Sequence, residues 1–189
     1  MNSSQVKLII IISIFILPFF ISYNMLDDYS PGKEYSTTNY GELIDPMVNI
    51  KNTVIKSNSD DESLPNGKWL LIYYINSPCD KDCMNNIYLM RQVNTALGKD
   101  MDRLKRLLVS NEVLTEDMET NIVQLYPYII LIKNKPNNIH VLIKGITKNK
   151  NSLFLVDPLG NVILRYDDNF NGKKLLKDIK KLFKLSRVG

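Results

Sequence analysis

Two cysteines carry the clearest chemical signal in this sequence. Cys79 and Cys83 are the only cysteines, and they lie within the segment Asn-Ser-Pro-Cys-Asp-Lys-Asp-Cys at 76–83. An apolar run of strand length, residues 69–75, precedes them, and a helix-like segment reaching about Leu97 follows. Two thiols at the junction between a strand and a helix indicate either sulfur redox chemistry or binding of a soft metal ion.

The spacing of the two cysteines leaves three roles open. Redox motifs usually have two intervening residues, whereas three separate Cys79 from Cys83. Sulfurs about one helical turn apart can both bind one Cu(I) ion, or they can close a disulfide. For thiol-disulfide exchange, Cys79 near the helix N-cap is the expected nucleophile and Cys83, one turn further on, the resolving thiol. A purely structural disulfide is the third interpretation, although closing so small a loop adds little stability.

The surrounding pattern predicts the elements that position these cysteines. Helices are expected from about 83 to 97, from 115 to 125 and from 175 to 183, because apolar residues recur there at three- and four-residue steps. Strands are expected at 69–75, 104–110, 139–143, 152–156 and 162–166, with Asp-Pro-Leu-Gly at 157–160 as a type I turn between the last two. This order predicts an α/β fold, with a thioredoxin-like central sheet flanked by helices.

The N-terminal segment predicts a membrane anchor. Residues 8–26 form an apolar run about long enough to cross a bilayer. Lys7 precedes the run and Asp27 and Asp28 follow it, so residues 1–7 are expected in the cytoplasm and the remainder in the periplasm, on a single-pass inner-membrane protein. A cleaved signal peptide is the alternative, but no small-residue cleavage site follows the run.

The remaining sequence divides into a tether and a domain. Residues 27–66 carry prolines and a polar run and are expected to be a linker, in which 47–50 could pair with the domain as an extra strand. Residues 67–189 are expected to form the thioredoxin-like domain. The chain has 189 residues and a formal net charge of +4, which is too weak a basic character to indicate nucleic-acid binding. A lysine-rich C-terminal segment, 173–187, suits either a solvated helix face or contact with anionic lipids or an acidic partner.

Two segments resemble a known family. The first runs from Trp69 to Gly98, with Pro-Cys-x-x-x-Cys at 78–83 and Tyr-Leu-Met-Arg-Gln-Val at 88–93. The second is Leu-Val-Asp-Pro-Leu-Gly-Asn at 155–161. Over about 67–185, together with the N-terminal anchor, the sequence resembles a bacterial membrane-anchored family associated with cytochrome c oxidase biogenesis, distantly related to the SCO copper chaperones.

The resemblance implies a domain outside the membrane that assists the copper centre of a terminal oxidase. In SCO proteins two cysteines and a distal histidine bind copper, and the cysteines carry over onto Cys79 and Cys83. The implied partner is a cytochrome c oxidase subunit or another assembly factor. The family's histidine position falls near Asn149, so this ligand does not carry over.

His140 is the one histidine of the chain and the remaining candidate for a third copper ligand. Its alternative is a partly exposed strand residue beside Ile139 and Val141. Met84 could supply a thioether, whereas Met90 fits the apolar face of the helix. Without an imidazole, the two thiolates suit Cu(I) better than Cu(II).

Three hypotheses for the function follow. The first is an accessory factor for cytochrome c oxidase assembly that handles Cu(I) or reduces copper-ligand cysteines. The second is a periplasmic thiol-disulfide oxidoreductase. Proteins of that class are expected to have a proline directly before the strand at 152–156, and this sequence has none there. The third is a non-catalytic assembly scaffold.

Overall fold

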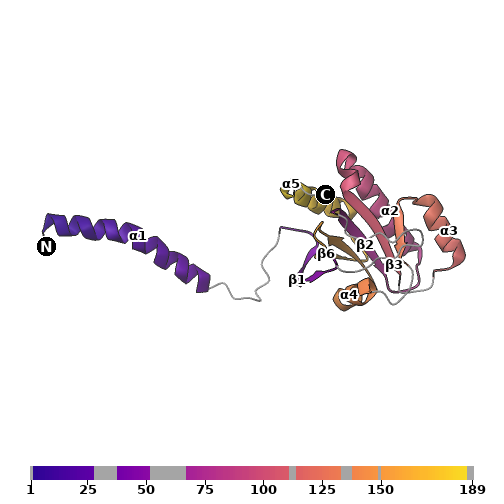
Figure 1. Cartoon of the computed structure of the whole chain (residues 1–189), viewed down its shortest axis with the longest axis horizontal. Coiled ribbons are helices and arrows are strands. Elements are labelled where there is room, and N and C mark those ends of the chain that lie inside the picture. The colour runs from indigo at the N-terminus through magenta and orange to yellow at the C-terminus, as the bar shows by residue number, and fades with distance from the viewer. Residues whose placement is uncertain are drawn as a thin grey trace. The chain divides into compact units, whose positions relative to one another are not determined.

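The computed structural model describes residues 2–27, 38–51, 67–110, 114–132, 138–148 and 150–186. The chain divides into two units, Met1–Thr37 and Thr38–Gly189 (Figure 1).

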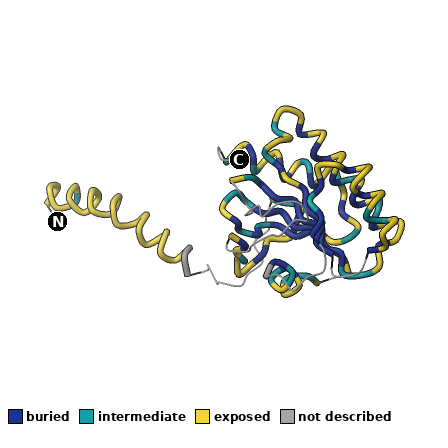
Figure 2. Tube along the Cα trace, turned by 45° about the vertical axis from the view of Figure 1, so that its right-hand side comes forward, coloured by how far each residue is buried: buried dark blue, intermediate teal, exposed yellow. Residues whose placement is uncertain are grey.

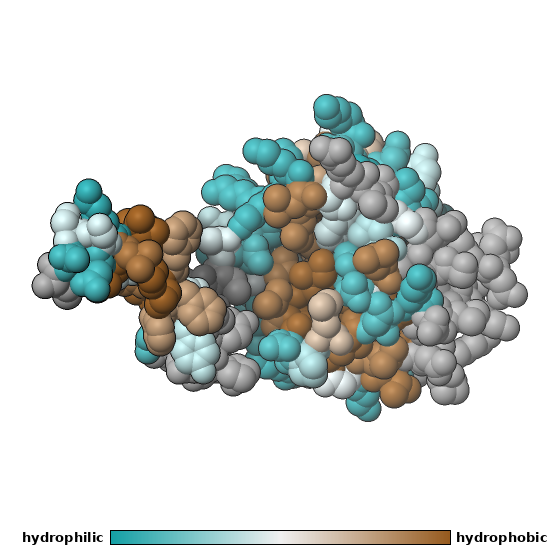
Figure 3. Space-filling model, turned by 60° about the vertical axis from the view of Figure 1, so that its left-hand side comes forward, coloured by the Kyte–Doolittle hydropathy of each residue, from teal (hydrophilic) through white to brown (hydrophobic). Residues whose placement is uncertain are grey.

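The first unit contains one long apolar helix, α1 (Ser3–Asp27). Its segment Ser3–Asn24 spans 22 residues with a mean hydropathy of 2.4. At 1.5 Å per residue this segment is about 33 Å long, which matches the hydrocarbon thickness of a bilayer. Its isoleucine, leucine and phenylalanine side chains are exposed, and Figure 3 shows them as a brown, apolar surface. α1 is therefore long and apolar enough to cross a membrane.

The second unit is built on a six-stranded mixed sheet. Its strands are β1 (Glu42–Asn49), β2 (Trp69–Ile75), β3 (Leu104–Ser110), β4 (Ile129–Ile132), β5 (Asn151–Val156) and β6 (Asn161–Asp167). They lie in the order β1-β6-β5-β2-β3-β4. The central strand β2 is parallel to β3 and antiparallel to β5. Every residue of β2 is buried, as expected for a strand with helices on both faces.

Helices cover both faces of this sheet. On one face, α2 (Lys81–Ala96), α3 (Glu116–Leu125) and α5 (Gly172–Leu185) contribute to one apolar core, and α2 packs against α5. On the other face, α4 (Asn138–Ile146) covers a second core. A short 3-10 helix, η1 (Gly98–Arg103), leads from α2 into β3. Figure 2 shows the buried strands, in dark blue, between the helices. The predicted α/β architecture is confirmed.

The strand predicted at 139–143 is wrong, because this segment is helix α4. Alternating Ile139, Val141 and Ile143 imitate a strand, but Val141 is 66% exposed. The side chains that pack on the sheet are Ile139, Leu142, Ile143 and Ile146. These positions follow the helical spacing of three and four residues, which therefore decides the local structure.

The folded unit begins earlier than residue 67. β1 lies inside the segment expected to be a linker and pairs antiparallel with β6, from Glu42 opposite Arg165 to Asn49 opposite Asn161. The extra strand considered at 47–50 is thus part of a longer strand. β4 is a further element that the sequence pattern did not predict, and it extends the sheet beyond β3 in parallel register. The other predicted strands and helices agree with the structure within a few residues.

Candidate redox site

Cys79 and Cys83 are joined by a disulfide at the point where β2 leads into α2. Their Cα atoms lie 5.2 Å apart. The bond spans the first turn of the helix, so the one-turn separation expected from the spacing is realised. Both sulfurs therefore lie at the same end of the sheet, beyond the last residue of its central strand.

Asp80, and not Cys79, is the N-cap of α2. Its carboxylate accepts a hydrogen bond of 3.0 Å from the backbone N–H of Cys83. Cys79 is therefore the residue before the cap, outside the helix. Because Asp80 binds an amide of the first turn, its charge stabilises the helix start that carries Cys83.

The two cysteines differ in exposure. Cys79 is 7% exposed, whereas Cys83 is fully buried in the core beneath α2. The predicted asymmetry, with a more accessible Cys79 and a sheltered Cys83, is present although both lie largely inside the protein. The exposed surface of the pair thus belongs to Cys79.

A buried polar network lies beside the disulfide. The Tyr73 hydroxyl donates a 2.6 Å hydrogen bond to the carboxylate of Asp168, in the loop after β6. Asn86, one turn after Cys83 on α2, donates to the Tyr73 oxygen at 3.1 Å and to Asp168 Oδ1 at 2.8 Å. Burial raises the pKa of Tyr73, and the hydrogen bond to Asp168 raises this pKa further. Tyr73 thus remains a neutral hydrogen-bond donor at physiological pH.

The same network holds the loop that carries Cys79. Asn151, the first residue of β5, donates to Asp168 Oδ2 at 3.2 Å. Its Oδ1 accepts from the backbone N–H of Asn76 at 3.0 Å and from the Ser77 hydroxyl at 3.2 Å. Asp168 is therefore linked through Asn151 to the two residues that precede Pro78 and Cys79. We call Tyr73, Asn86, Asn151 and Asp168 the polar network.

Sequence analysis did not single out the polar network. Its members come from β2, α2, β5 and the β6–α5 loop. They meet because the C-terminal ends of β2 and β6 lie beside the N-terminal end of β5. The sequence did contain a signal for this network, namely polar residues at the ends of these strands. Polar residues at 76–77, 151 and 167–169 bound three apolar strands, and the ends of adjacent strands meet in space.

The structure does not bring His140 to the cysteines. His140 lies on α4, and its ring is 5.4 Å, between centroids, from that of Tyr74. Tyr74 belongs to the core on the α4 face, whereas Cys79 and Cys83 belong to the core on the opposite face. Burial lowers the pKa of His140, and the nearby Lys144 lowers this pKa further. The sheet therefore separates the imidazole from the sulfurs.

The two methionines lie in or against the same apolar core as the cysteines. Met90 is fully buried in the core, and Met84 packs against that core. Asn149 lies outside the described residues. Among the residues that the structure describes, no group of three or more histidine, cysteine, aspartate or glutamate side chains could hold a metal ion. Two sulfurs can serve as a two-coordinate Cu(I) site but not as the three-ligand site expected with His140.

The sequence of the folded unit matches a known family. Residues 69–186 match the family described as transmembrane-like, thioredoxin-like, C-terminal domain. The chain belongs to this family. The match begins at the first residue of β2 and includes the disulfide, the polar network and all helices of the second unit. No curated protein matches the chain.

Several solved structures share the fold of this family member. Copper-bound ScoI from Arabidopsis thaliana matches with a TM-score of 0.51 and 13% identity, over 64% of this chain and 86% of ScoI. The thioredoxin domain of a thiol-disulfide oxidoreductase from Bacteroides vulgatus matches with a TM-score of 0.52 and 17% identity, over 75% and 96%. A thiol:disulfide interchange protein from Bacteroides sp. matches with a TM-score of 0.52 and 20% identity, over 78% and 91%. The resemblance to SCO and thioredoxin-like proteins is therefore confirmed at the level of the fold.

Proposed function

We propose that this chain is a membrane-anchored, thioredoxin-like dithiol protein that assists the assembly of cytochrome c oxidase. The observation that carries the proposal is the Cys79–Cys83 disulfide across the first turn of α2, with one sulfur at the surface side and one buried. Its substrate would be a disulfide formed by the copper-ligand cysteines of an oxidase subunit. Those cysteines must be reduced before they can bind copper, because the thiolate is the metal ligand.

The reaction is a two-electron exchange. In the reduced protein, the Cys79 thiolate attacks one sulfur of the substrate disulfide and releases the other as a thiol. Cys83 then attacks the Cys79 sulfur of the mixed disulfide. The products are a substrate with both thiols free and the Cys79–Cys83 disulfide. A partner protein of the dithiol class must then reduce this disulfide for a further cycle.

Binding of Cu(I) by the reduced pair is the second candidate activity. The spacing supports it, because sulfurs that close a disulfide can also turn toward one soft cation. The copper-bound ScoI neighbour is a protein of the same fold that carries copper. Cu(I) would be cargo held by the two thiolates and passed to the oxidase subunit.

The proposed location follows from α1. The helix would anchor the chain in the bacterial inner membrane, with residues 1–7 in the cytoplasm because Lys7 precedes the apolar run and Asp27 follows it. The folded unit would then face the periplasm. This compartment suits a protein whose cysteines pass through a disulfide.

The proposal is tested in cells that produce the Cys79→Ser/Cys83→Ser chain in place of the wild type. We expect oxidase activity and copper content to fall, and a membrane-permeant dithiol reductant to restore them. The control is the conservative variant Ser186→Ala, far along the chain from the cysteines. Normal oxidase assembly in the double variant would reject both dithiol activities and leave a scaffold. A Cu(I) competition titration on the reduced full-length protein separates the two candidates, because only the second requires cysteine-dependent binding.

A further inference from the structure

Helix α5 has an apolar face and a cationic face. Leu175, Ile179 and Phe183 are buried against the sheet. The opposite side carries six exposed lysines: Lys173, Lys174, Lys177, Lys180, Lys181 and Lys184. At about 100° per residue these six fall within an arc of roughly 120°. We call these residues the lysine face of α5.

The one acidic residue of α5 does not neutralise the lysine face. Asp178 is 2% exposed, and its carboxylate accepts hydrogen bonds from the backbone N–H groups of Tyr40 and Gly41 and from the Tyr166 hydroxyl. Its charge therefore points into the fold. The lysine face is a cationic strip from Lys173 to Lys184, with no exposed acidic residue in the same helix.

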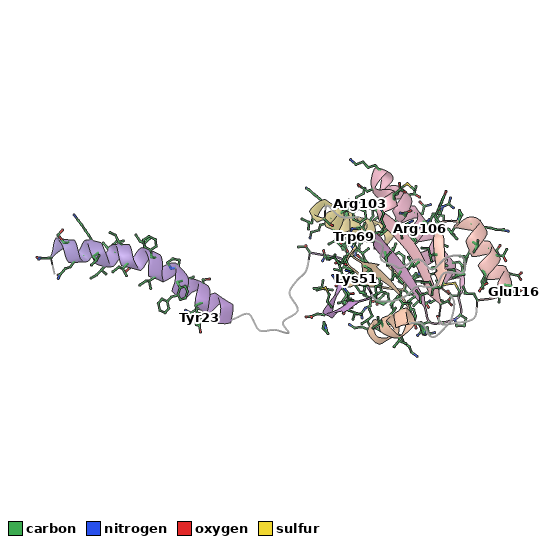
Figure 4. All side chains as sticks on the ribbon, in the orientation of Figure 1. Tyr23, Lys51, Trp69, Arg103, Arg106 and Glu116 are labelled. Atoms are coloured by element: carbon green, nitrogen blue, oxygen red, sulfur yellow. A yellow bond between two sulfur atoms is a disulfide. The ribbon has the colours of Figure 1, made fainter. Side chains whose placement is uncertain are left out.

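α5 is held firmly in the fold. The rings of Trp69 and Phe183 lie 5.4 Å apart between centroids, and the guanidinium of Arg103 lies 4.3 Å from the Phe183 ring centroid. Trp69 and Arg103 are labelled beside the helix in Figure 4. The Arg103 side chain also donates a 2.9 Å hydrogen bond to the backbone oxygen of Ser186. The lysine face is thus a surface in a fixed orientation.

The first residues of the folded unit, Thr38 and Tyr40, contact α5. Lys181 Nζ donates a hydrogen bond to the Thr38 hydroxyl. The ammonium groups of Lys174 and Lys177 lie 5.3 and 5.8 Å from the centroid of the Tyr40 ring. Ten residues, 28–37, separate the end of α1 from Thr38. A chain of ten residues spans at most about 35 Å, whatever its conformation.

We propose that the lysine face of α5 binds the anionic headgroups of the phospholipid bilayer in which α1 is inserted. The proposal rests on the anchoring part of the proposed function, and not on the chemistry of the cysteines. Two observations favour lipid over an acidic protein. The strip of like charge suits a surface of many anions, and the ten-residue tether holds Thr38 within about 35 Å of the end of α1. Tethering also keeps headgroups at high effective concentration.

This contact would set the height of the redox site above the membrane. α2 packs against α5 on the same sheet face, and Cys79 and Cys83 lie at the N-terminal end of α2. A bilayer-bound α5 would therefore hold the disulfide at a fixed distance from the lipid surface. Such a placement suits a substrate that is itself embedded in the membrane.

The test is amine footprinting of the full-length protein in vesicles. The chain is reconstituted into phosphatidylcholine alone or mixed with phosphatidylglycerol, and acylation of each lysine is followed by mass spectrometry. We expect acylation of the lysine face to slow by at least about threefold in the mixed vesicles, because each lysine near an anionic surface is attracted to it. High salt should abolish the difference. Lys81, Lys105 and Lys144, on α2, β3 and α4, should react equally in both lipids.

A pair of variants fixes the interpretation. In Lys173→Gln/Lys180→Gln/Lys184→Gln, the remaining α5 lysines should lose their protection, whereas Lys81→Gln/Lys105→Gln/Lys144→Gln should keep it. Equal acylation in the two lipids, or protection that appears only when an acidic protein is added, would overturn the proposal. Flotation of the chain with vesicles in alkaline carbonate reports insertion of α1 separately. A chain that does not float contradicts the anchor, and this outcome is thereby distinguished from failure of the lipid contact.

Discussion

Cys79 and Cys83 form a pair whose two members have different surroundings. Cys79 is 7% exposed, whereas Cys83 is fully buried. Asp80 fixes the helix start between them through its hydrogen bond to the Cys83 amide. These surroundings support the proposed exchange, in which Cys79 would attack the substrate and Cys83 would resolve the mixed disulfide.

Asn151 is the positioning residue that we expect to matter most for this pair. Asn151→Ala leaves the Asn76 amide, the Ser77 hydroxyl and the Asp168 carboxylate each without one hydrogen bond. We expect the free energy of unfolding to fall by about 1–3 kcal/mol, the usual cost of unpaired buried polar groups. Because the loop before Cys79 loses its hydrogen bonds to Asn151, a given concentration of dithiothreitol should also reduce the disulfide faster. Urea unfolding measures the change in stability, and acid-quenched samples of the dithiothreitol reaction measure the rate of disulfide reduction.

Two variants separate positioning from general stability. Asn169→Ala changes the exposed residue that follows Asp168 and should leave both quantities unchanged. Ser77→Ala removes one hydrogen bond but keeps the Asn76 amide bond, so its effect on the reduction rate should be smaller than that of Asn151→Ala. If Asn151→Ala loses stability and yet is reduced at the wild-type rate, the polar network supports the fold and not the site.

Sequence alone predicted the cysteines but not their polar surroundings. Cys79 and Cys83 are four positions apart, so local helical geometry is enough to place their sulfurs together. Tyr73 and Asp168 are 95 positions apart, and they meet only because β2, β5 and β6 pair in one particular register. His140 illustrates the same limit, since the face on which it lies depends on whether its segment is a strand or a helix.

β1 is the element that ties the N-terminal part of the folded unit to α5. It pairs with β6, and the residues just before it contact Asp178 through the amides of Tyr40 and Gly41. The close approach requires glycine at position 41, because a Cβ atom there would lie 2.6 Å from Cζ of Tyr166. This contact fixes the point at which the chain leaves toward α1.

Gly41→Ala is predicted to destabilise the folded unit. The added methyl group would displace the Tyr166 ring, whose hydroxyl donates a 2.7 Å hydrogen bond to buried Asp178. We expect a loss of about 1–3 kcal/mol, the usual cost of overpacking a core. The matched control is Gly145→Ala on α4, where nothing lies within 4 Å of the new Cβ. That variant should gain about 0.5–1 kcal/mol from helix propensity. Equal effects of the two substitutions on urea unfolding would contradict the packing argument.

Elements with a single clear period were predictable from the sequence, and ambiguous ones were not. β2 is a continuous apolar run and α5 has a regular helical stripe, so both were predicted. In α4 the alternating and the helical spacing coincide at Ile139 and Ile143, and tertiary packing decides between them. β4 directly follows a turn and has only four residues, and so short a strand shows no recognisable alternation of apolar and polar residues.

At the scale of the whole molecule, an apolar helix and a thioredoxin-like unit are joined in one chain. The fold is shared with a copper-bound protein and with thiol-disulfide oxidoreductases, so it does not by itself choose between copper and disulfide chemistry. The choice lies in the site, and its two cysteines suit either chemistry. In the proposed function, disulfide exchange comes first because the two sulfurs already form a bond across the first turn of α2.

The folded unit is predicted to lose stability in alkali through two buried tyrosines. Burial, with hydrogen bonds to Asp168 and Asp178 respectively, raises the pKa of Tyr73 and of Tyr166 above the ordinary value of 10.0. A raised pKa in the folded state gives stability that is complete below pH 10 and declines as pH rises further, because the unfolded chain then releases more protons. Urea unfolding between neutral and strongly alkaline pH should show this decline.

Tyrosine variants identify the groups responsible for the alkaline decline. Tyr166→Phe lacks one buried phenol, so its stability should fall less steeply above pH 10 than that of the wild type, although it starts lower. Tyr128→Phe removes a phenol that is 80% exposed and should leave the slope unchanged. Identical slopes in the wild type and Tyr166→Phe would show that the buried phenols do not govern the alkaline limit.

The most direct test of the central claim is to trap the exchange intermediate. Full-length Cys83→Ser and Cys79→Ser chains, both reduced, are mixed with the oxidised copper-binding subunit of cytochrome c oxidase, and mixed disulfides are identified by mass spectrometry. The account predicts a disulfide between Cys79 and the subunit in Cys83→Ser, and none in Cys79→Ser, because only the sulfur on the surface side can attack. Trapping through Cys83 alone, or through neither cysteine, would contradict the account.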